Sequence, residues 1–295
     1  MEPKMRELLV VADRDGNTNP AFIHALEIAK NTGAKIEFVG FVHAPGIDSS
    51  EILSNAEKRK VQHHFMDQKQ AEMDAFLASV DLKDVKLNVD VVWERSFERW
   101  VIARCEQKSF DMVFKTGNRS ESVTHSPSDW QLMRHCPSSV MVVGQSPWKS
   151  GGIVLAALDL GSSKEHALKL NEEILSQAFA LAKATNSEVH ACYSSSMPAA
   201  IAKLELFDSS DYEKKMKESI DPIISKLITD GGLNKDSIHL VSGNPAKEIV
   251  RIINKIEADV VVLGNKTRVS LRGRLLGGTA KNVLHTVSGD VVIVK

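Results

Sequence analysis

The sequence lacks the features that mark a secreted, membrane-bound or strongly charged protein. Its longest apolar runs, such as Val260–Leu263, are far too short to span a bilayer. The N-terminal residues Met1–Glu7 carry acids and lack the apolar core of a signal peptide. The net charge is −1 at pH 7, so no global field favours nucleic acid or an anionic membrane as a partner. We therefore expect a cytoplasmic protein with no membrane and no nucleic-acid partner.

Cysteine is scarce and scattered. The chain has 295 residues but three cysteines, and no two of them form a Cys-x-x-Cys motif. An odd, dispersed set argues against a disulfide framework and for a reducing compartment. We expect each thiol to be a small buried apolar group rather than a nucleophile. The three are Cys105, Cys136 and Cys192.

Motifs of familiar hydrolases are also missing. The sequence has no Gly-x-Ser-x-Gly, no metalloprotease motif and no Ser-His-Asp set that spacing alone identifies. His63 and His64 are adjacent and would point to different faces of a helix. His43 and His190 lie on or near second strands, where a carboxylate or another hydrogen-bonding partner is expected rather than a metal. No catalytic residue and no metal site are predicted.

The sequence does contain apolar strands that alternate with amphipathic helices, which is typical of parallel βαβ units. In the first half, strands are predicted at residues 6–12, 35–43, 85–93, 111–115 and 139–144, and helices at 19–32, 50–80, 97–108 and 127–135. A linker rich in turn-forming residues is predicted at 145–152. In the second half, strands are predicted at 153–158, 188–193, 238–241, 259–264 and 290–295, and helices at 165–185, 210–230, 245–256 and 279–284.

The two halves repeat one another. Asp13 and Asp159 each end a first strand and lie 146 residues apart, while Asp111 and Asp259 lie 148 residues apart. Offsets this similar indicate a tandem repeat of about 150 residues. We predict two α/β domains, at residues 1–146 and 152–295.

One stretch of the second half carries the strongest functional signal. The apolar strand 259–264 ends at Gly264, a basic loop follows, and a cluster of small residues then opens a helix. Small residues at a helix start leave backbone N–H groups accessible to a phosphate. The pattern predicts an anion or nucleotide cradle beyond the end of a strand. The charges of the loop come from Lys266, Arg268, Arg272 and Arg274.

This stretch resembles the glycine-rich signature of the universal stress proteins, which is Gly-x-x-Gly, nine residues, then Gly-Ser or Gly-Thr. Gly264 and Gly277 match its first and last glycines. Thr267 replaces the middle glycine, and Gly278 stands before Thr279. The whole chain resembles two such domains in tandem, in particular those of the bacterial universal stress protein E group. Three stretches carry this wider resemblance, at residues 129–140, 243–245 and 276–280.

The resemblance implies two Rossmann-like domains of the adenine nucleotide alpha hydrolase-like type. Each would be a five-stranded parallel sheet in order 3-2-1-4-5 with helices on both faces. In such a sheet the order reverses between strands 1 and 4, and ligands bind in the crevice at the carboxyl ends there. The resemblance therefore implies a site for ATP or AMP, with Mg²⁺, in the second domain. The residues that would line it are Asp159, Gly264, Arg268, Gly277, Gly278 and Thr279.

Several of these residues also have a structural alternative. Asp159 would equally suit a helix cap or a partner for backbone amides. Gly264 would suit a tight strand exit, and Gly277 and Gly278 would suit close packing of a helix on the sheet. Thr267 would crowd a phosphate or need an unfavourable positive φ. Both interpretations stay open at this point.

The first half departs further from the signature. Asp13 is retained, but the fourth strand leads into Lys115, Thr116 and Gly117, and the position of the last glycine falls near Pro127. A proline there removes an N–H group that a phosphate would need. No nucleotide site is expected in the first half.

The fifth strands of the two halves are predicted to pair. Val140–Val143 and Val291–Val294 are apolar on both faces and lie at sheet edges, where exposure would invite aggregation. The resemblance implies that such strands pair to form dimers. The two halves would then make a pseudo-dimer within one chain, and further self-association stays open.

The implied function is that of a non-enzymatic cytoplasmic stress-response protein that binds a small-molecule ligand in its second domain. Two alternatives stay open. One is an enzyme of the same fold that hydrolyses ATP or transfers adenylate. The other is an interaction module whose nucleotide site has been lost. No nucleophile or base is recognisable in the loop between Gly264 and Gly277, and likeness of fold is weak evidence for chemistry.

Overall fold

The computed structural model describes residues 5–14, 18–117, 127–144, 148, 151–195, 209–229, 231–265, 268–270, 273–275 and 277–295. The chain divides into two compact units, with the division between Pro147 and Trp148. This division falls inside the turn-rich segment 145–152. Among the described helices, none combines the length and the apolar character that crossing a membrane requires.

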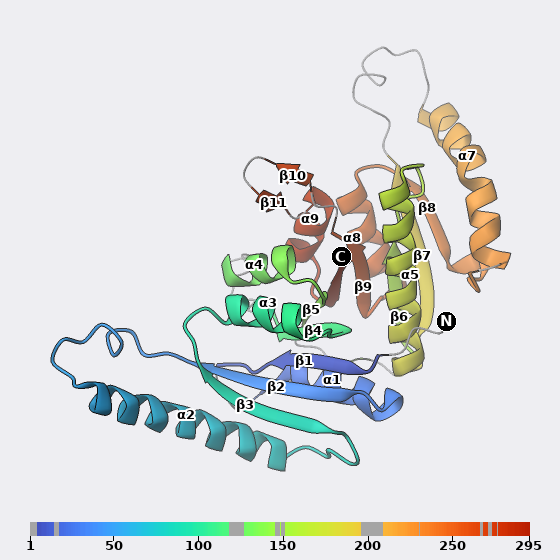
Figure 1. The fold of residues 1–295 in the computed structure, drawn as a ribbon. Helices are drawn as coiled ribbons and strands as arrows, with labels where there is room; N and C mark the ends of the chain where they lie inside the picture. Colours follow the sequence, from blue (N-terminus) through green and yellow to red (C-terminus); the bar gives the residue numbers. More distant parts are fainter. Residues whose placement is uncertain are drawn as a thin grey trace. The chain divides into compact units, whose positions relative to one another are not determined.

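The first unit contains a parallel sheet in the order β3-β2-β1-β4-β5 (Figure 1). The predicted order 3-2-1-4-5 is therefore confirmed for this unit. Its strands are β1 (Glu7–Val11), β2 (Lys35–Val42), β3 (Leu87–Trp93), β4 (Met112–Thr116) and β5 (Ser139–Val143). Its helices are α1 (Pro20–Thr32), α2 (Asn55–Ala78), α3 (Phe97–Gln107) and α4 (Pro127–His135).

Helices cover both faces of this sheet. Successive side chains of a strand point to opposite faces, so neighbouring residues contact helices on different sides. Phe38 of β2 points toward α1 and α2, where its ring lies 4.5 Å from that of Phe22 and 6.3 Å from that of Phe76. The neighbouring Glu37 points to the other face and meets Arg104 of α3. Helix α4 packs beside α3. The core of the first unit thus lies on both sides of β2.

The second unit repeats this arrangement, with a parallel sheet in the order β8-β7-β6-β9-β12. In chain order this is again 3-2-1-4-5, as predicted. Its strands are β6 (Ile153–Ala157), β7 (Glu188–Ser195), β8 (Ile238–Ser242), β9 (Val260–Gly264) and β12 (Asp290–Val294). Its helices are α5 (Glu165–Thr185), α7 (Ser209–Thr229), α8 (Pro245–Ile256) and α9 (Gly278–Thr286), with a short 3₁₀ turn at Lys235–Ser237.

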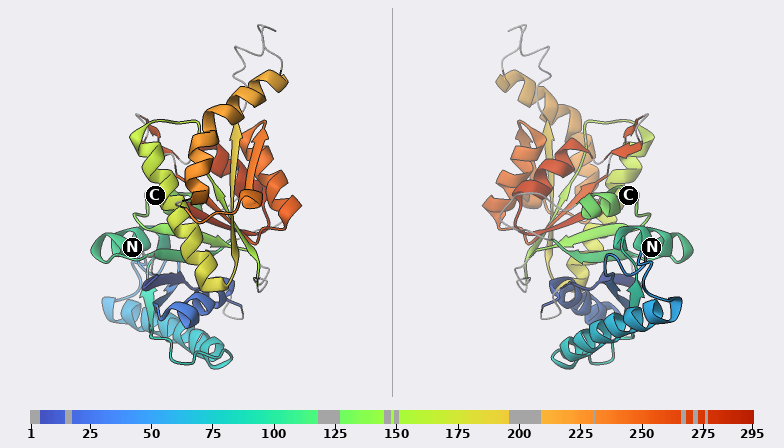
Figure 2. Two further views of the ribbon diagram at one scale, coloured as in Figure 1. Left: turned by 90° about the vertical axis from the view of Figure 1, so that its right-hand side faces the viewer. Right: turned by 90° about the vertical axis from the view of Figure 1, so that its left-hand side faces the viewer.

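Right-handed crossovers place α5 and α7 on one face of the second sheet and α8 and α9 on the other (Figures 1 and 2). Helix α5 contacts β6, β7 and β9, while α8 contacts β6, β7, β8 and the neighbouring helix α9. The carboxyl ends of β6 and β9 therefore lie between α5 on one face and α8 and α9 on the other.

Local sequence signals set the helix ends. Ser54 Oγ accepts the N–H of Glu57 at 3.3 Å, and the Glu57 carboxylate accepts the N–H of Ser54 at 2.9 Å. This capping box starts α2 at Asn55 rather than at the predicted residue 50. At the C-terminal end of α1, Gly33 adopts a φ of 73°, which residues with a side chain rarely adopt.

Part of the basic loop of the second half forms regular secondary structure, which the sequence did not predict. Its described residues form two short strands, β10 (Arg268–Ser270) and β11 (Gly273–Leu275), which pair antiparallel. Three-residue strands are too short to show an alternating pattern in the sequence. Thr267 lies outside the described residues, so its effect on a bound phosphate stays a prediction.

A buried carboxylate ties α3 to the first sheet. Glu37 is 6% exposed, and Arg104 holds it with Nε 2.6 Å from Oε1 and Nη2 2.9 Å from Oε2. Lys108 Nζ lies 3.3 Å from Oε2. Burial would raise the pKa of Glu37, but the hydrogen bonds and charges of Arg104 and Lys108 outweigh it and lower the pKa below its ordinary value. The ionised carboxylate is thus the form that the fold stabilises.

Replacing Glu37 with Gln should lower the free energy of unfolding by about 2 kcal/mol near pH 7, because the buried pair loses its charge while Arg104 stays partly hydrated. The folded pKa is lowered, so this stabilisation is complete above about pH 4.5 and is lost as the pH falls through the folded pKa. Urea unfolding from pH 3 to 7 should show native and variant curves that converge at low pH.

The matched control is Glu165→Gln, which removes an exposed carboxylate 2.8 Å from Lys169. Its cost should stay below about 1 kcal/mol, because exposed pairs are screened by solvent. Equal losses for the two variants would contradict the role given to Glu37.

Candidate functional site

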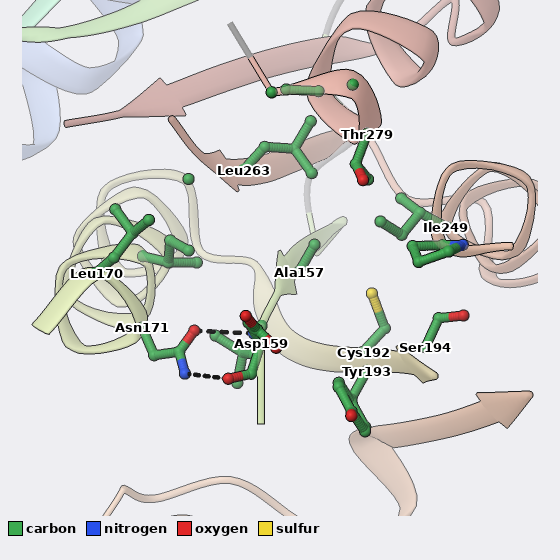
Figure 3. A pocket seen from close by; sticks show the side chains of 17 residues that line it. Ala157, Asp159, Leu170, Asn171, Cys192, Tyr193, Ser194, Ile249, Leu263 and Thr279 are labelled. Atoms are coloured by element: carbon green, nitrogen blue, oxygen red, sulfur yellow. Dashed lines mark hydrogen bonds between the residues drawn. The ribbon is translucent and has the colours of Figure 1, made fainter. Parts of the chain in front are cut away.

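The second unit contains a cavity at the carboxyl ends of β6 and β9, where the strand order reverses (Figure 3). Its volume is about 620 Å³, within the roughly 300–1,000 Å³ that small-molecule sites occupy. Of the six predicted site residues, Arg268 has its backbone in β10, and its side chain lies outside the described part of the chain. Five predicted site residues line the cavity, namely Asp159, Gly264, Gly277, Gly278 and Thr279.

Asp159 is held in place by an amide side chain that the sequence did not single out. Asn171 Oδ1 accepts the backbone N–H of Asp159 at 2.9 Å, and Asn171 Nδ2 donates to the Asp159 carbonyl at 2.9 Å (Figure 3). Lys164 is the N-cap of α5 and its side chain makes no capping hydrogen bond, so Asp159 is not the N-cap residue of that helix. Asn171 therefore fixes the chain where β6 meets the cavity.

Gly264 is required by packing. A Cβ on this residue would lie 2.6 Å from Leu170 Cδ2 and 3.0 Å from Ile174 Cδ1, far inside normal contact distance. Its φ is not among the positive values that favour glycine. The missing side chain lets α5 approach the end of β9. Close approach of α5, rather than a special backbone conformation, thus explains Gly264.

The start of α9 forms the polar end of the cavity. Gly277 is the N-cap and has no side chain with which to cap the helix, and the first turn contains no acidic residue. First-turn N–H groups have no acceptor within a helix, and the helix dipole makes this end positive. A Cβ on Gly278 would meet nothing within 4 Å. The alternative that Gly278 serves close helix–sheet packing is therefore wrong.

The other walls of the cavity are largely apolar. Leu170 and Ile174 come from α5, Ile249 from α8 and Leu263 from β9. Cys192 of β7 points into the cavity in Figure 3, and burial raises the pKa of its thiol to about 12. The thiol is neutral at pH 7 and therefore adds to the apolar surface.

Sequence reasoning missed the wall formed by α5 and β7. Parallel pairing places Cys192 opposite Ala157, so β7 reaches the cavity together with the end of β6. Tyr193 follows on β7, with its hydroxyl against Gly161. Asn171 did carry a signal in the sequence, because it is a polar residue on the apolar face of the predicted helix 165–185. The β7 residues carried none, since their strand reads as ordinary core.

In the first unit, two polar side chains contact the chain at the corresponding end of the first strand. The Asp13 N–H donates to Asn19 Oδ1 at 2.8 Å, which parallels the contact between Asp159 and Asn171. Lys69 of α2 reaches over the end of β1 and donates to the carbonyls of Asp13 at 2.7 Å and Arg14 at 3.0 Å. Lys69 is 5% exposed. A buried ammonium group thus lies where the first strand ends.

A pair of histidines joins β7 to β8. His190 Nδ1 and His239 Nε2 are hydrogen-bonded at 2.9 Å, and their rings are stacked. The predicted carboxylate partner of His190 is Glu188, whose Oε2 lies 3.7 Å from Nε2. Burial lowers the pKa of His239, and the charges of His190 and Lys255 lower it further. Within the described residues, no cluster of three or more metal-ligating side chains is found.

Known proteins share this sequence pattern. Residues 153–295 match the model of the universal stress protein family. Universal stress protein E of Escherichia coli is 28% identical over 98% of this chain and 94% of its own length. The second half of the chain thus matches the universal stress protein family, and the whole chain is similar to universal stress protein E. The universal stress protein E homolog of Haemophilus influenzae is 26% identical over 99% of this chain and 98% of its own. The predicted resemblance to the E group is confirmed.

Solved structures share the fold of this protein. A protein of unknown function from Pseudomonas aeruginosa superposes with a TM-score of 0.73 at 20% identity, covering 99% of this chain and 92% of its own. A universal stress protein from Archaeoglobus fulgidus superposes with a TM-score of 0.61 at 15% identity, covering 100% and 97%. At these identities the likeness concerns the fold alone.

The two cavity glycines should respond differently to an added methyl group. Gly264→Ala should lower the free energy of unfolding by about 1–3 kcal/mol, because the new Cβ overlaps Leu170 and Ile174. Gly278→Ala should change stability by under about 1 kcal/mol, since its Cβ enters open space and alanine favours a helix. Urea unfolding of the two variants measures both values, and a reversed order would contradict the packing described here.

The histidine pair should make stability depend on pH. The folded pKa of His239 is lowered, so its contribution is complete above about pH 6.5 and is lost as the pH falls from there through the folded pKa. His239→Gln should remove this part of the pH dependence in urea unfolding between pH 5 and 8. His166→Gln, at an exposed position of α5, should leave it unchanged. An unaltered profile in His239→Gln would contradict the assignment.

Proposed function

We propose that this protein is a non-enzymatic binding protein of the stress response and that its second unit binds an adenine nucleotide. The match of residues 153–295 to the family and the similarity of the whole chain to universal stress protein E support the role in the stress response. The observation that carries the ligand is the start of α9, with a glycine as its N-cap, at one end of a cavity whose other walls are largely apolar.

The start of α9 suits phosphate. Phosphate oxygens would accept hydrogen bonds from first-turn N–H groups, and the positive helix end favours their charge. The open space at Gly278 leaves room for a phosphate to approach the backbone. Thr279, at the cavity edge in Figure 3, adds a hydroxyl group. The donor set therefore fits the phosphate part of ATP or AMP.

The apolar walls suit the base. A planar ring buried against Leu170, Ile174 and Ile249 would gain about 25 cal/mol for each Å² of apolar surface removed from water. Magnesium would be held chiefly by phosphate oxygens and water, because Mg²⁺ keeps much of its hydration and needs few protein ligands. Asp159 provides a carboxylate at the same cavity.

Hydrolysis or transfer of adenylate is the second candidate function, and the described cavity residues give it little support. The thiol of Cys192 is neutral because burial raises its pKa. The hydroxyl of Ser194 donates to the carbonyl of Gly243 at 3.1 Å, with no general base shown beside it. A nucleophile needs such a base or a lowered pKa. We therefore propose binding without turnover.

The location in the cytoplasm and the pairing of the two fifth strands within one chain belong to the same proposal. The apolar sequences of Val140–Val143 and Val291–Val294 are the reason to expect pairing, because such edges aggregate when they are left open. Both stay predictions.

Calorimetric titration of ATP, ADP and AMP, each with Mg²⁺, tests the proposal. The native chain should bind one nucleotide saturably. Gly278→Ala should weaken binding about tenfold, or 1.4 kcal/mol, because its Cβ takes space needed by a phosphate while stability is retained. Thr267→Gly should tighten binding, because it restores the family's middle glycine.

The possible outcomes separate the candidate functions. Binding that appears only in Thr267→Gly would mean that Thr267 blocks a lost site. Absence of binding in both would overturn the nucleotide proposal and favour an interaction module. Steady release of ADP or AMP from ATP would favour the enzyme. Glu165→Gln, at an exposed position of α5, controls for general effects of a substitution in the second unit.

A further inference from the structure

The two units place different residues at equivalent positions beside the fourth strand. Lys115 is the last residue but one of β4 and pairs with Val142 of β5. Leu263 is the last residue but one of β9 and pairs with Ile293 of β12. Strand register thus makes Lys115 and Leu263 counterparts.

The next helices correspond in the same way. Helices α4 and α9 both have 9 residues and both lead to the fifth strand of their unit. The third residue of α4 is Asp129, and the third residue of α9 is Ala280. Leu263 and Ala280 both line the cavity of the second unit. Their counterparts in the first unit are therefore Lys115 and Asp129.

These counterparts form a buried ion pair. Lys115 Nζ lies 3.2 Å from Asp129 Oδ1, with the two side chains 11% and 2% exposed. The same ammonium donates to the Thr116 carbonyl at 2.9 Å and lies 5.4 Å from the centre of the Phe97 ring. Close partners on several sides hold Lys115 in place. Two charges thus fill the positions that line an open cavity in the second unit.

Asp129 also lies in the first turn of its helix, where a negative charge is stabilised by the helix dipole. The first turn of α9 contains no acidic residue. We propose that the Asp129 carboxylate is a built-in anion, held by Lys115 at the start of α4, which closes the crevice of the first unit to phosphate-bearing ligands. This inference does not require the second unit to bind a nucleotide.

Removing the Asp129 carboxylate has a physical consequence for Lys115, its partner in the ion pair. Removing the Asp129 carboxylate leaves the Lys115 ammonium buried without its counter-charge, which is strongly unfavourable. A small anion that enters the vacated space would restore the pair. Such binding stabilises the folded state in proportion to the logarithm of the anion concentration. The variant should therefore gain a phosphate dependence that the native first unit lacks.

Thermal unfolding of Asp129→Ala in increasing sodium phosphate, at an ionic strength held constant with NaCl, tests this inference. Without phosphate its Tm should fall below that of the native chain. At a tenfold excess of phosphate over its Kd, the Tm should rise by about 3 °C more than that of the native chain. Any phosphate site in the second unit contributes equally to both proteins and cancels in the difference.

A double variant, Lys115→Leu with Asp129→Ala, copies the second unit and is the matched control. It removes both charges, so its Tm should exceed that of Asp129→Ala and its response to phosphate should return to the native level. Asp129→Asn removes the charge but leaves the space filled, so its Tm should fall while its response to phosphate stays below that of Asp129→Ala. Refolding yield in phosphate against chloride gives the same comparison if these variants fold poorly.

Equal responses to phosphate in the native chain and in Asp129→Ala would overturn the inference, as would a response that persists in the double variant. In the first case Asp129 would not stand in for an anion, and in the second Lys115 would not be the group that holds it. Failure to refold in either salt would also count against the inference.

Discussion

Both units depend on one constraint of the parallel sheet, which is the reversal of strand order between the first and fourth strands. The chain leaves the sheet in opposite directions at the two carboxyl ends, so a gap remains between them. The helix after the fourth strand begins beside this gap with N–H groups that the helix itself cannot satisfy. A positive helix end in a partly closed space favours a negative or hydrogen-bonding partner. Each unit of this protein therefore needs such a partner at the start of that helix.

The two units meet this need differently. In the first unit Lys115 and Asp129 form a buried pair, and the Thr116 hydroxyl accepts the N–H of Ala21 at 3.2 Å. In the second unit Gly264 stands at the position of Thr116, and a cavity of about 620 Å³ opens beside it. The second unit lacks the polar side chains that the first unit has at these positions, and a cavity lies there instead. At equivalent positions, one repeat thus has a buried ion pair and the other lines a cavity.

Much of the fold could be predicted because its signals are local. Alternation and helical periodicity placed α5 at 165–185 and α8 at 245–256, as observed. The repeat offset and the family resemblance led to the strand order. The hairpin of β10 and β11 was missed, because strands of three residues show no pattern. Five candidate site residues lie around one cavity, yet Asn171 was missed because its partner Asp159 lies twelve residues away in a different element.

The sequence by itself determined the strands, the helices, the tandem repeat and the position of the glycine-rich loop, since each rests on residue types at short spacing. Only the tertiary structure decided what those residues do. It showed that Gly264 makes room for α5 and that Gly278 faces open space. It also brought Lys115 and Asp129 together as an ion pair. Such contacts depend on how helices lie against strands, and no local pattern records the distance between two side chains that meet only after folding.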